Sequence, residues 1–509
     1  MREFVIAADR HIVGFGPVKA LIGQADKSVW PREALIGLKL IAPDSLECES
    51  VRSESSLTDA AQGHDRIRFF LKERLLRNFR DVARAFLDEA GPCAIEVTSA
   101  ELLDEGSRAF FEALAGMPRA KVTVTMTLGA SGAGAMVNTS SAAERRIDDT
   151  VRGAAPSEGD LDFLYEQAIR YLSVGDSWTA VRILQALLPH RGTPAVWGRL
   201  GLGYAMLGRS LEAEFCYVRW REDADPVSSA GASYALSMLY ARHHPAHLRS
   251  LDRTARFLEE GYAVLEKADE ETEDLEFHMV FNRNGYALVE FRRGRVNEAV
   301  AHLTNGIEKL RNGSAKNRMH QTVLIYNLAQ CYRRVGDNVA AIETYQQLLE
   351  VDGKMPEYHM ELAHCYMDAG RTDDALASLL TARELGPSIL EVHSLLGYVY
   401  LQSGDMGNAE LSYRAAHECD ERDFDALYDY AYVLAESERP REALTVVEGR
   451  SLEGLDAEQQ ARLLTLAAEQ HAGLGDLPAA RTALERVLVL TPDDHDARAN
   501  LDRVLKECA

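Results

Sequence analysis

From about residue 160 to the end of the chain, apolar residues recur at intervals of three and four, the spacing of one buried face of an α-helix. Residues 328–349, 362–385 and 396–416 repeat this pattern most closely, with a period of 34 residues. Each block contains a glycine at the same place. The residues at this place along the chain are Gly175, Gly208, Gly294, Gly336, Gly370, Gly404, Glu438 and Gly475. A period of about 20–50 residues predicts a stack of similar structural units.

Small residues recur at two further places in each block, and they predict where two helices approach each other closely. Seven positions before the glycine the residues are Gly201, Ala287, Ala329, Ala363, Gly397, Ala431 and Ala468. Five positions after it they are Ala180, Ala213, Ala299, Ala341, Ala375, Ala409, Ala443 and Ala480. The glycine supplies the left-handed backbone that ends the first helix. Pro387 and Pro492 stop the second helix of their blocks.

In these positions the blocks resemble the tetratricopeptide repeat. The resemblance covers residues 161–509 and implies a mostly α-helical protein, an α-solenoid in which eight or nine helical hairpins form a right-handed superhelix. Residues 495–509 have the helical spacing and charged positions of a capping helix. The stretch 222–280 is less regular, and it fits either two divergent repeats or one repeat with an insertion.

Residues 1–127 predict a small α/β domain. Apolar β-rich runs at 93–97 and 121–128 flank a helical stretch at 99–117, which is the order of a βαβ unit with parallel strands. Residues 4–8 and 34–42 fit either a strand or a helix. Residues 63–90 form a long amphipathic stretch. The Gly-, Ser- and Ala-rich segment 128–160 predicts a linker or mobile loop.

The βαβ stretch also resembles the second half of a P-loop ATPase of the AAA/STAND kind. Such proteins carry an acidic pair for magnesium after the strand, but here Thr98 and Ser99 follow it. A phosphate-binding loop requires GxxxxGK[ST], and the nearest approach, residues 23–28, lacks the second glycine. We therefore expect neither bound nucleotide nor hydrolysis. The domain is either a degenerate ATPase or an unrelated α/β fold.

Composition and charge narrow the functional classes. The chain has 56 Lys and Arg against 79 Asp and Glu, a net charge of −23, which argues against nucleic acid and anionic membranes as partners. No apolar run spans a bilayer or forms a secretion signal. Seven cysteines without a CxxC motif suit a reducing compartment, so we expect a cytoplasmic protein.

Catalytic and metal-binding patterns are missing from the sequence. His359 and His364 are five residues apart on one predicted helix, so they do not share a face. Cys331 and Cys365 recur at a packing position and are interpreted as buried thiols. We therefore expect no metal, no cofactor and no enzymatic activity.

The resemblance implies a concave groove lined by the first helix of each repeat. In members that bind extended peptides, an asparagine nine positions before the turn glycine commonly holds the peptide backbone, and Asn327 occupies that position before Gly336. Asn284 lies one position earlier in its own repeat. The groove is expected to be basic near 292–334, suiting an acidic partner, and acidic and aromatic near 425–436. The candidate groove residues are Asn284, Tyr326, Asn327, Gln330, Arg333, Arg334, His364, Tyr398, Tyr428 and Tyr432.

Three functional hypotheses remain at this stage. The first is a non-enzymatic scaffold or adaptor that binds another protein or a peptide in the groove. The second is a STAND-like regulatory protein, in which the repeats sense a partner and the N-terminal domain transmits the signal. The third, with least in its favour, is an enzyme with an unrecognised site in the N-terminal domain.

Overall fold

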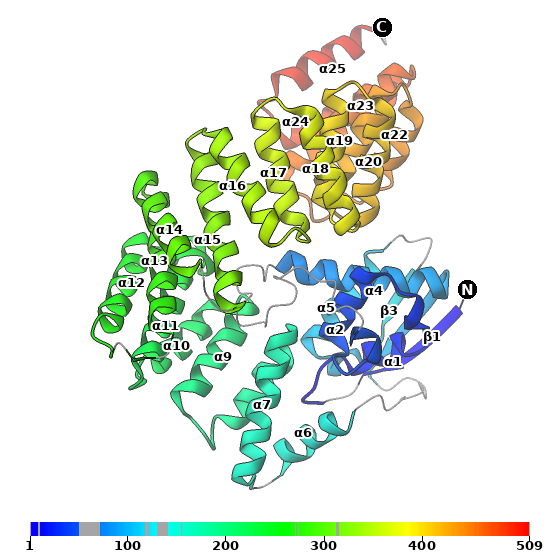
Figure 1. The fold of residues 1–509 in the computed structure, drawn as a ribbon. Helices are drawn as coiled ribbons and strands as arrows, with labels where there is room; N and C mark the ends of the chain where they lie inside the picture. Colours follow the sequence, from blue (N-terminus) through cyan, green and yellow to red (C-terminus); the bar gives the residue numbers. More distant parts are fainter. Residues whose placement is uncertain are drawn as a thin grey trace. The chain divides into compact units, whose positions relative to one another are not determined.

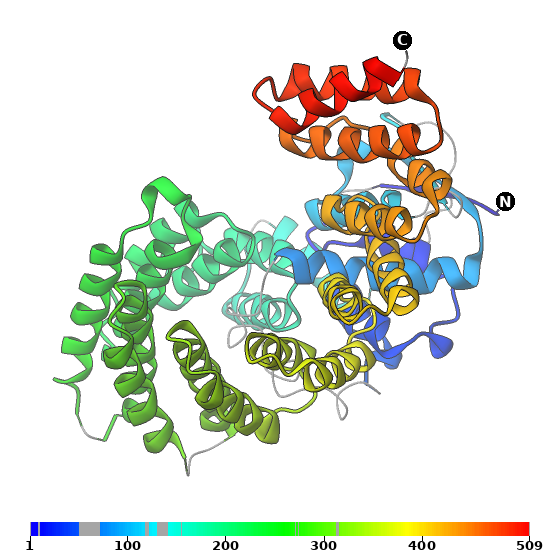
Figure 2. The same cartoon turned by 90° about the horizontal axis from the view of Figure 1, so that it is seen from above.

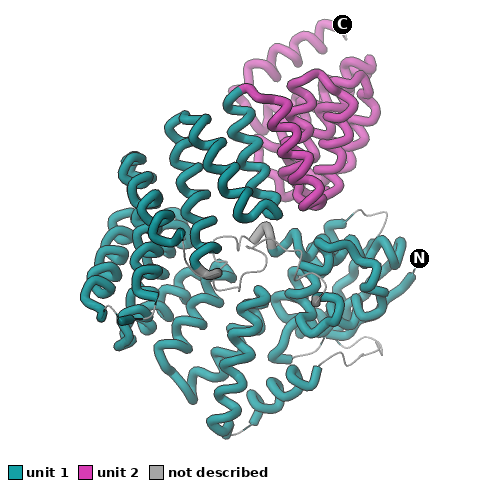
Figure 3. The backbone as a smooth tube through the Cα atoms, viewed as in Figure 1, with its two compact units in different colours: residues 1–369 teal, residues 370–509 magenta. Residues whose placement is uncertain are grey.

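The computed structural model describes residues 2–8, 11–49, 72–117, 122–129, 141–153, 155–269, 271–272, 274–311 and 315–507. The chain divides into two compact units, residues 1–369 and 370–509 (Figure 3). The first unit contains the N-terminal α/β domain together with the first helical hairpins. The boundary between the units falls inside the series of repeats.

The N-terminal domain is built on a parallel sheet with the strand order β1-β2-β3 (Figure 1). The strands pair in register, with Ile6 opposite Val97 and Val97 opposite Met126. Helix α5 connects β2 to β3, as the predicted βαβ unit requires. The elements are β1 (Arg2–Ala7), α1 (Gly16–Ile22), α2 (Arg32–Ile41), α4 (Lys72–Ala90), β2 (Cys93–Thr98), α5 (Glu105–Ala115) and β3 (Val122–Met126).

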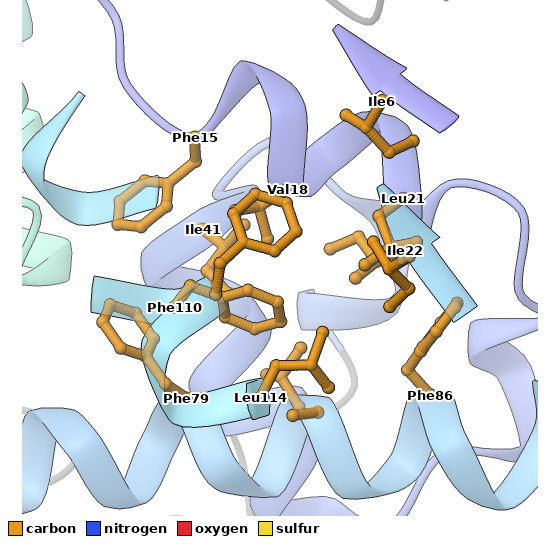
Figure 4. Packing of buried hydrophobic residues seen from close by; sticks show 14 of the residues in the cluster. Ile6, Phe15, Val18, Leu21, Ile22, Ile41, Phe79, Phe86, Phe110 and Leu114 are labelled. Carbon is orange, nitrogen blue, oxygen red and sulfur yellow. The ribbon is translucent and has the colours of Figure 1, made fainter. Parts of the chain in front are cut away.

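One face of this sheet packs against the helices, and Figure 4 shows the resulting core. Ile6 from β1, Phe79 and Phe86 from α4, and Phe110 and Leu114 from α5 are almost completely buried. The core also settles the two stretches left open by the sequence. Residues 4–8 begin in strand β1, whereas residues 34–41 are helical because their buried side chains recur every three or four residues.

Part of the segment 128–160, which the sequence predicts to be a linker or mobile loop, is helical in the structure. Helix α6 (Ala142–Arg152) lies within it and begins with a capping box formed by Ser141 and Glu144. Lys19 Nζ donates to Glu144 Oε1 at 2.6 Å, and both side chains are buried. This ion pair fixes α6 to α1, so at least residues 142–152 are part of the folded unit. Residues 130–140 lie outside the described residues.

The helices after α6 form antiparallel hairpins in chain order. In the first unit they are α7 (Glu158–Val174), α8 (Ser177–Leu187), α9 (Pro194–Met206), α10 (Ser210–Trp220), α11 (Pro226–Met238), α12 (Leu251–Leu265), α13 (Leu275–Arg292), α14 (Val296–Leu310), α15 (Ala315–Arg334), α16 (Asn338–Val351) and α17 (Pro356–Asp368). Neighbours in this series lie side by side (Figures 1 and 2). The irregular stretch contains one complete hairpin, formed by α11 and α12, so it holds a single divergent repeat with a longer connection, residues 239–250, between its helices.

The second unit continues the same pattern. Its helices are α18 (Thr372–Leu385), α19 (Leu390–Gln402), α20 (Met406–Cys419), α21 (Phe424–Glu436), α22 (Pro440–Glu448), α23 (Ala457–Gly473), α24 (Leu477–Leu490) and α25 (His495–Glu507). Helix α25 packs on α24, in the place predicted for a capping helix.

The repeat positions behave as the sequence predicts in both units. All eight residues at the turn position have positive φ, including Glu438 at 58°. All eight alanines of the second helices are completely buried. A Cβ added to Gly201 would lie 2.6 Å from the ring of Tyr217, and one added to Gly397 would lie 2.8 Å from Tyr413. Small residues are therefore required where the two helices of a hairpin cross.

Candidate protein-binding surfaces

The two asparagines of the candidate groove lie next to each other in the first unit. Asn327 is on α15 and Asn284 is on α13, and Asn327 Nδ2 donates to Asn284 Oδ1 at 2.8 Å. Asn284 is 7% exposed, whereas Asn327 is half-buried. The amide donor expected to hold a peptide backbone thus already has an acceptor within the protein.

Arg333 differs from the expectation of a free basic residue that attracts an acidic partner. Its Nη1 lies 3.3 Å from Glu361 Oε2, and its Nε lies 3.0 Å from Asp368 Oδ2. The hydroxyl of Tyr326 donates to the other Glu361 oxygen at 3.0 Å. Two carboxylates on α17 therefore offset the charge of Arg333, which weakens its attraction for an acidic segment.

The remaining predicted groove residues of the first unit differ from one another in burial and in hydrogen bonding. Gln330 Nε2 donates to the hydroxyl of Tyr345 at 2.6 Å, and Tyr345 is buried. Burial lowers the pKa of His364, which therefore favours the neutral imidazole. Arg334 is exposed to solvent. In this unit most polar groups at the groove positions satisfy one another.

The predicted tyrosines of the second unit are more accessible. Tyr398 on α19 is 49% exposed and Tyr432 on α21 is 39% exposed. Tyr428 stacks on Tyr432, with ring centroids 6.4 Å apart and an interplanar angle of 15°. The guanidinium of Arg462 on α23 lies 4.2 Å from the centroid of Tyr428. We call Tyr398, Tyr428 and Tyr432 the tyrosine surface.

Carboxylates accompany the tyrosine surface. Burial, and then the neighbouring Asp425, raise the pKa of Asp429 to about 6. The pKa of Glu469 is also raised, first by burial and then by Glu436. Like charges thus face one another here, and only Arg462, 3.7 Å from Asp425, is paired with them among the described residues. The acidic and aromatic end that the sequence predicts is present in this unit.

Several of these residues were missed by the sequence reasoning although the repeat register marks them. Glu361 lies nine residues before Gly370, which is the repeat position of Asn327, and Asp368 follows at the position of Arg334. Arg462 and Glu469 lie thirteen and six residues before Gly475, which are the repeat positions of Val323 and Gln330. The groove-facing positions of a first helix lie thirteen, ten, nine, six, three and two residues before the turn residue, and applying them to every repeat would have found all four residues.

The first unit also has a cavity between the α/β domain and the first hairpins. Its volume is about 610 Å³, and its lining includes Asp104, Glu105, Trp178, Arg182 and Arg209. Next to this cavity, the α/β domain contacts helix α8. The amide of Gly14 donates to Thr179 Oγ1 at 2.9 Å, and Phe15 packs edge-on against Trp178.

The segment nearest to a phosphate-binding loop has a different structure. Residues 27–29 form a short 3-10 helix, and Asp26 Oδ1 accepts hydrogen bonds from the amide and the hydroxyl of Ser28. On β2, Glu96 accepts a hydrogen bond from Thr127 Oγ1 at 3.0 Å. The Asp26 carboxylate therefore already accepts the hydrogen bond of the Ser28 backbone amide, which a phosphate group would require in this segment.

The possible metal ligands and the cysteines of the described residues both bear on chemical activity. Within the part of the chain that the structure describes, no three His, Cys, Asp or Glu side chains are grouped to hold a metal ion. Cys331 and Cys365 are buried, and burial raises the pKa of each thiol to about 11. They are packing residues, as the sequence indicates. None of the described helices is both long and apolar enough to cross a membrane.

Comparison with known proteins places the repeats within the C-terminal half of the chain. Two tetratricopeptide-repeat families match, one over residues 332–397 and the other over 390–421. Neither reaches the N-terminal domain, so they give its ATPase resemblance no support. No curated protein matches the sequence.

Solved structures that resemble the chain include several repeat proteins. YrrB, described as a TPR protein with an unusual peptide-binding site, has a TM-score of 0.33 and 19% identity over 39% of this chain and 96% of its own. The protein pilF from Pseudomonas aeruginosa has a TM-score of 0.33 and 18% identity over 46% and 99%. A tetratricopeptide repeat protein from Parabacteroides merdae has a TM-score of 0.32 and 14% identity over 50% and 92%.

The matched segments coincide with the helices in which the turn glycines have positive φ and the alanines are buried. This chain is therefore a protein with tetratricopeptide repeats, which build the helical hairpins around residues 332–421.

Proposed function

We propose that this protein is a non-enzymatic, cytoplasmic scaffold that binds a segment of another protein on the tyrosine surface of its second unit. The observation that carries the proposal is the exposure of Tyr398 and Tyr432 at groove positions, beside carboxylates with raised pKa values. Exposed aromatic rings that gather on one surface exceed what solubility requires, and they are typical of binding sites.

The chemistry of this surface favours a segment that carries lysine or arginine. A cation placed on the rings of Tyr398 or Tyr432 gains a cation–π interaction of about 0.5–2 kcal/mol. It also relieves the repulsion between Glu436 and Glu469, and between Asp425 and Asp429. Arg462 already takes this place on Tyr428, which illustrates the contact a partner would make.

The test is an array of immobilised peptides probed with the full chain. We expect peptides with alternating cationic and apolar residues to retain the wild type, and the double variant Tyr398→Ala/Tyr432→Ala to lose them. Leu411→Ala is the matched control, because Leu411 on α20 is 52% exposed but lies on the second helix of its hairpin. Equal retention of the double variant and the control would refute the proposal.

The competing docking place is the α/β domain, where Val29 and Leu46 are exposed. The double variant Val29→Ala/Leu46→Ala separates the two places on the same array. Loss of binding in this variant, with full binding in Tyr398→Ala/Tyr432→Ala, would assign the partner to the N-terminal domain.

A regulatory role is the second candidate. It is favoured by the attachment of the α/β domain to α8 and by the cavity of about 610 Å³ at this junction. A small ligand there would contact both parts of the unit at once. Thermal melting of the full chain against a metabolite library tests this role, and stabilisation that Arg209→Ala abolishes would support it.

A further inference from the structure

A cluster of basic side chains lies at the turn between α11 and α12 in the first unit. Arg242, His243 and Arg249 belong to this turn, and Arg292 comes from the last turn of α13. We call these four residues the arginine cluster. The guanidinium of Arg292 donates to the carbonyl of Ala241.

A second carbonyl of the same turn holds another guanidinium. Arg249 Nε donates to the carbonyl oxygen of His244 at 2.8 Å. In the chain, Arg242 and His243 lie between the two carbonyls that anchor Arg292 and Arg249. Backbone hydrogen bonds therefore bring the guanidiniums of one helix and of the turn to one place.

No carboxylate compensates this charge within the described residues. Arg242, Arg249 and Arg292 form no ion pair there. The next arginines in the chain behave differently, since Arg293 Nη2 lies 2.8 Å from Asp252 and Arg295 pairs with Glu290. In a protein with 79 acidic and 56 basic residues, three unpaired arginines at one turn require an explanation.

The cluster also carries an electrostatic cost. Burial, followed by the charges of Arg242 and Arg249, lowers the pKa of Arg292. Burial and the same two arginines contribute to lowering the pKa of His243 to about 4, which leaves its imidazole neutral at pH 7. In addition, Arg242 Nε is buried without a hydrogen-bond partner. A bound anion would relieve the repulsion and accept this proton.

We propose that the arginine cluster is a binding site for a phosphate-type dianion. The planar forks of several guanidiniums match the oxygens of a tetrahedral oxyanion, and its two charges offset more of the local excess than one carboxylate does. The phosphate group comes either as the free ion or on a phosphorylated side chain of a partner. The site is independent of the tyrosine surface.

The experiment measures inorganic phosphate binding to the full chain by calorimetry and thermal melting, with ionic strength held constant by sodium chloride. We expect saturable binding at one site and a rise in melting temperature. Arg242→Gln should weaken the affinity at least tenfold. This side chain anchors no other element, so circular dichroism should be unchanged. Arg293→Gln, which removes a neighbouring but paired arginine, should leave phosphate binding intact.

Two results would overturn the site. The first is a wild type that binds phosphate more weakly than a Kd of about 1 mM, which corresponds to about −4 kcal/mol. The second is equal binding by Arg242→Gln, Arg249→Gln and the wild type. A phosphoserine peptide distinguishes the sources. Tighter binding of this peptide than of inorganic phosphate, again lost in Arg242→Gln, assigns the site to a phosphorylated partner. Equal or weaker binding of the peptide assigns it to the free ion.

Discussion

The side-chain amide of Asn327 donates to Oδ1 of Asn284 at 2.8 Å, which joins α15 to α13 across 43 residues of sequence. The two residues lie at nearly the same place in their repeats, so the stacking of successive first helices brings them together. Their pairing gives Asn327 a structural role whether or not a ligand binds in the first unit.

Removing this hydrogen bond should therefore destabilise the first unit. We expect Asn327→Ala to lower the free energy of unfolding by about 1 kcal/mol, because it leaves the buried Oδ1 of Asn284 without its donor. Chemical denaturation checks the loss, with the exposed Asn297→Ala as the control. In a double-mutant cycle with Asn284→Ala, strictly additive effects would contradict the coupling.

Glu438 is the one residue at the turn position that is not glycine, and its φ is 58°. The left-handed backbone costs a side-chain-bearing residue about 1–2 kcal/mol, while glycine adds about 0.4–1 kcal/mol of unfolded-state entropy. Glu438→Gly should therefore stabilise the second unit by about 0.5 kcal/mol. Gly404→Ala, at the same place with φ of 79°, should do the opposite. Denaturant midpoints that move in the same direction for both variants would contradict this explanation.

Ala409 tests the close contact of α19 with α20. Its side chain is completely buried, and the ring of Tyr413 lies where Gly397 leaves no room for a Cβ. Ala409→Trp should cost about 1–3 kcal/mol or more through overpacking. Leu411→Trp, two residues along the same helix on its exposed side, should leave the unfolding midpoint nearly unchanged. Similar midpoints for the two variants would rule out the packing role.

Asp176 should make the stability of the first unit depend on pH. The carboxylate caps α8 and is buried, and this burial raises its pKa from 3.8 to about 6 against the hydrogen bonds from Thr179. Between these values the folded protein keeps a proton that the unfolded chain has released. Its stabilising contribution is therefore complete below about pH 4 and is lost as pH rises through about 6.

Asp176→Asn should remove this slope while it keeps an acceptor for the Thr179 amide. The difference across the window is on the order of 2–3 kcal/mol. Denaturation series between pH 4 and 7 measure it, and Asp337→Asn at the exposed cap of α16 is the control. A wild-type stability that rises across the window, and rises equally in Asp176→Asn, would refute the assignment.

The repeat register could be predicted because its determinants are local. A glycine needed for positive φ and an alanine needed at a helix crossing appear in the sequence as themselves, and the structure confirms both. The capping box of Ser141 and Glu144 was equally visible, but the small residues around it favoured a linker interpretation. Residues 4–8 and 34–42 stayed ambiguous because short apolar runs fit both strands and helices.

For the candidate groove, the sequence could predict on which helices the residues lie, but not how their side chains pair. Repeat numbering placed Asn327, Arg333 and the tyrosines on the first helices, where the structure has them. It could not state which side chains pair between repeats. The pairing of Arg333 with Glu361 and Asp368 depends on how α15 lies against α17, and no periodicity within one repeat contains that information.

The proposed partner segment should bind to the tyrosine surface more tightly as pH rises. Asp429 has a pKa of about 6 because it is buried and close to Asp425. It is therefore largely neutral at pH 5 and ionised at pH 7.5, and only the ionised form attracts lysine or arginine. A charge-assisted hydrogen bond exceeds a neutral one by about 1 kcal/mol, so the Kd of a cationic peptide should fall about fivefold across this range.

The measurement is a fluorescence titration at constant ionic strength with a histidine-free peptide, so that only the protein changes its charge. Asp429→Asn should lose most of the pH dependence, and any remainder would come from Glu469, whose pKa is also raised. Asp425→Asn should keep the dependence but move its midpoint to lower pH, because Asp425 contributes to the raised pKa of Asp429. Affinity that is independent of pH in the wild type, or a dependence that is undiminished in Asp429→Asn, would show that Asp429 does not contact the cationic segment.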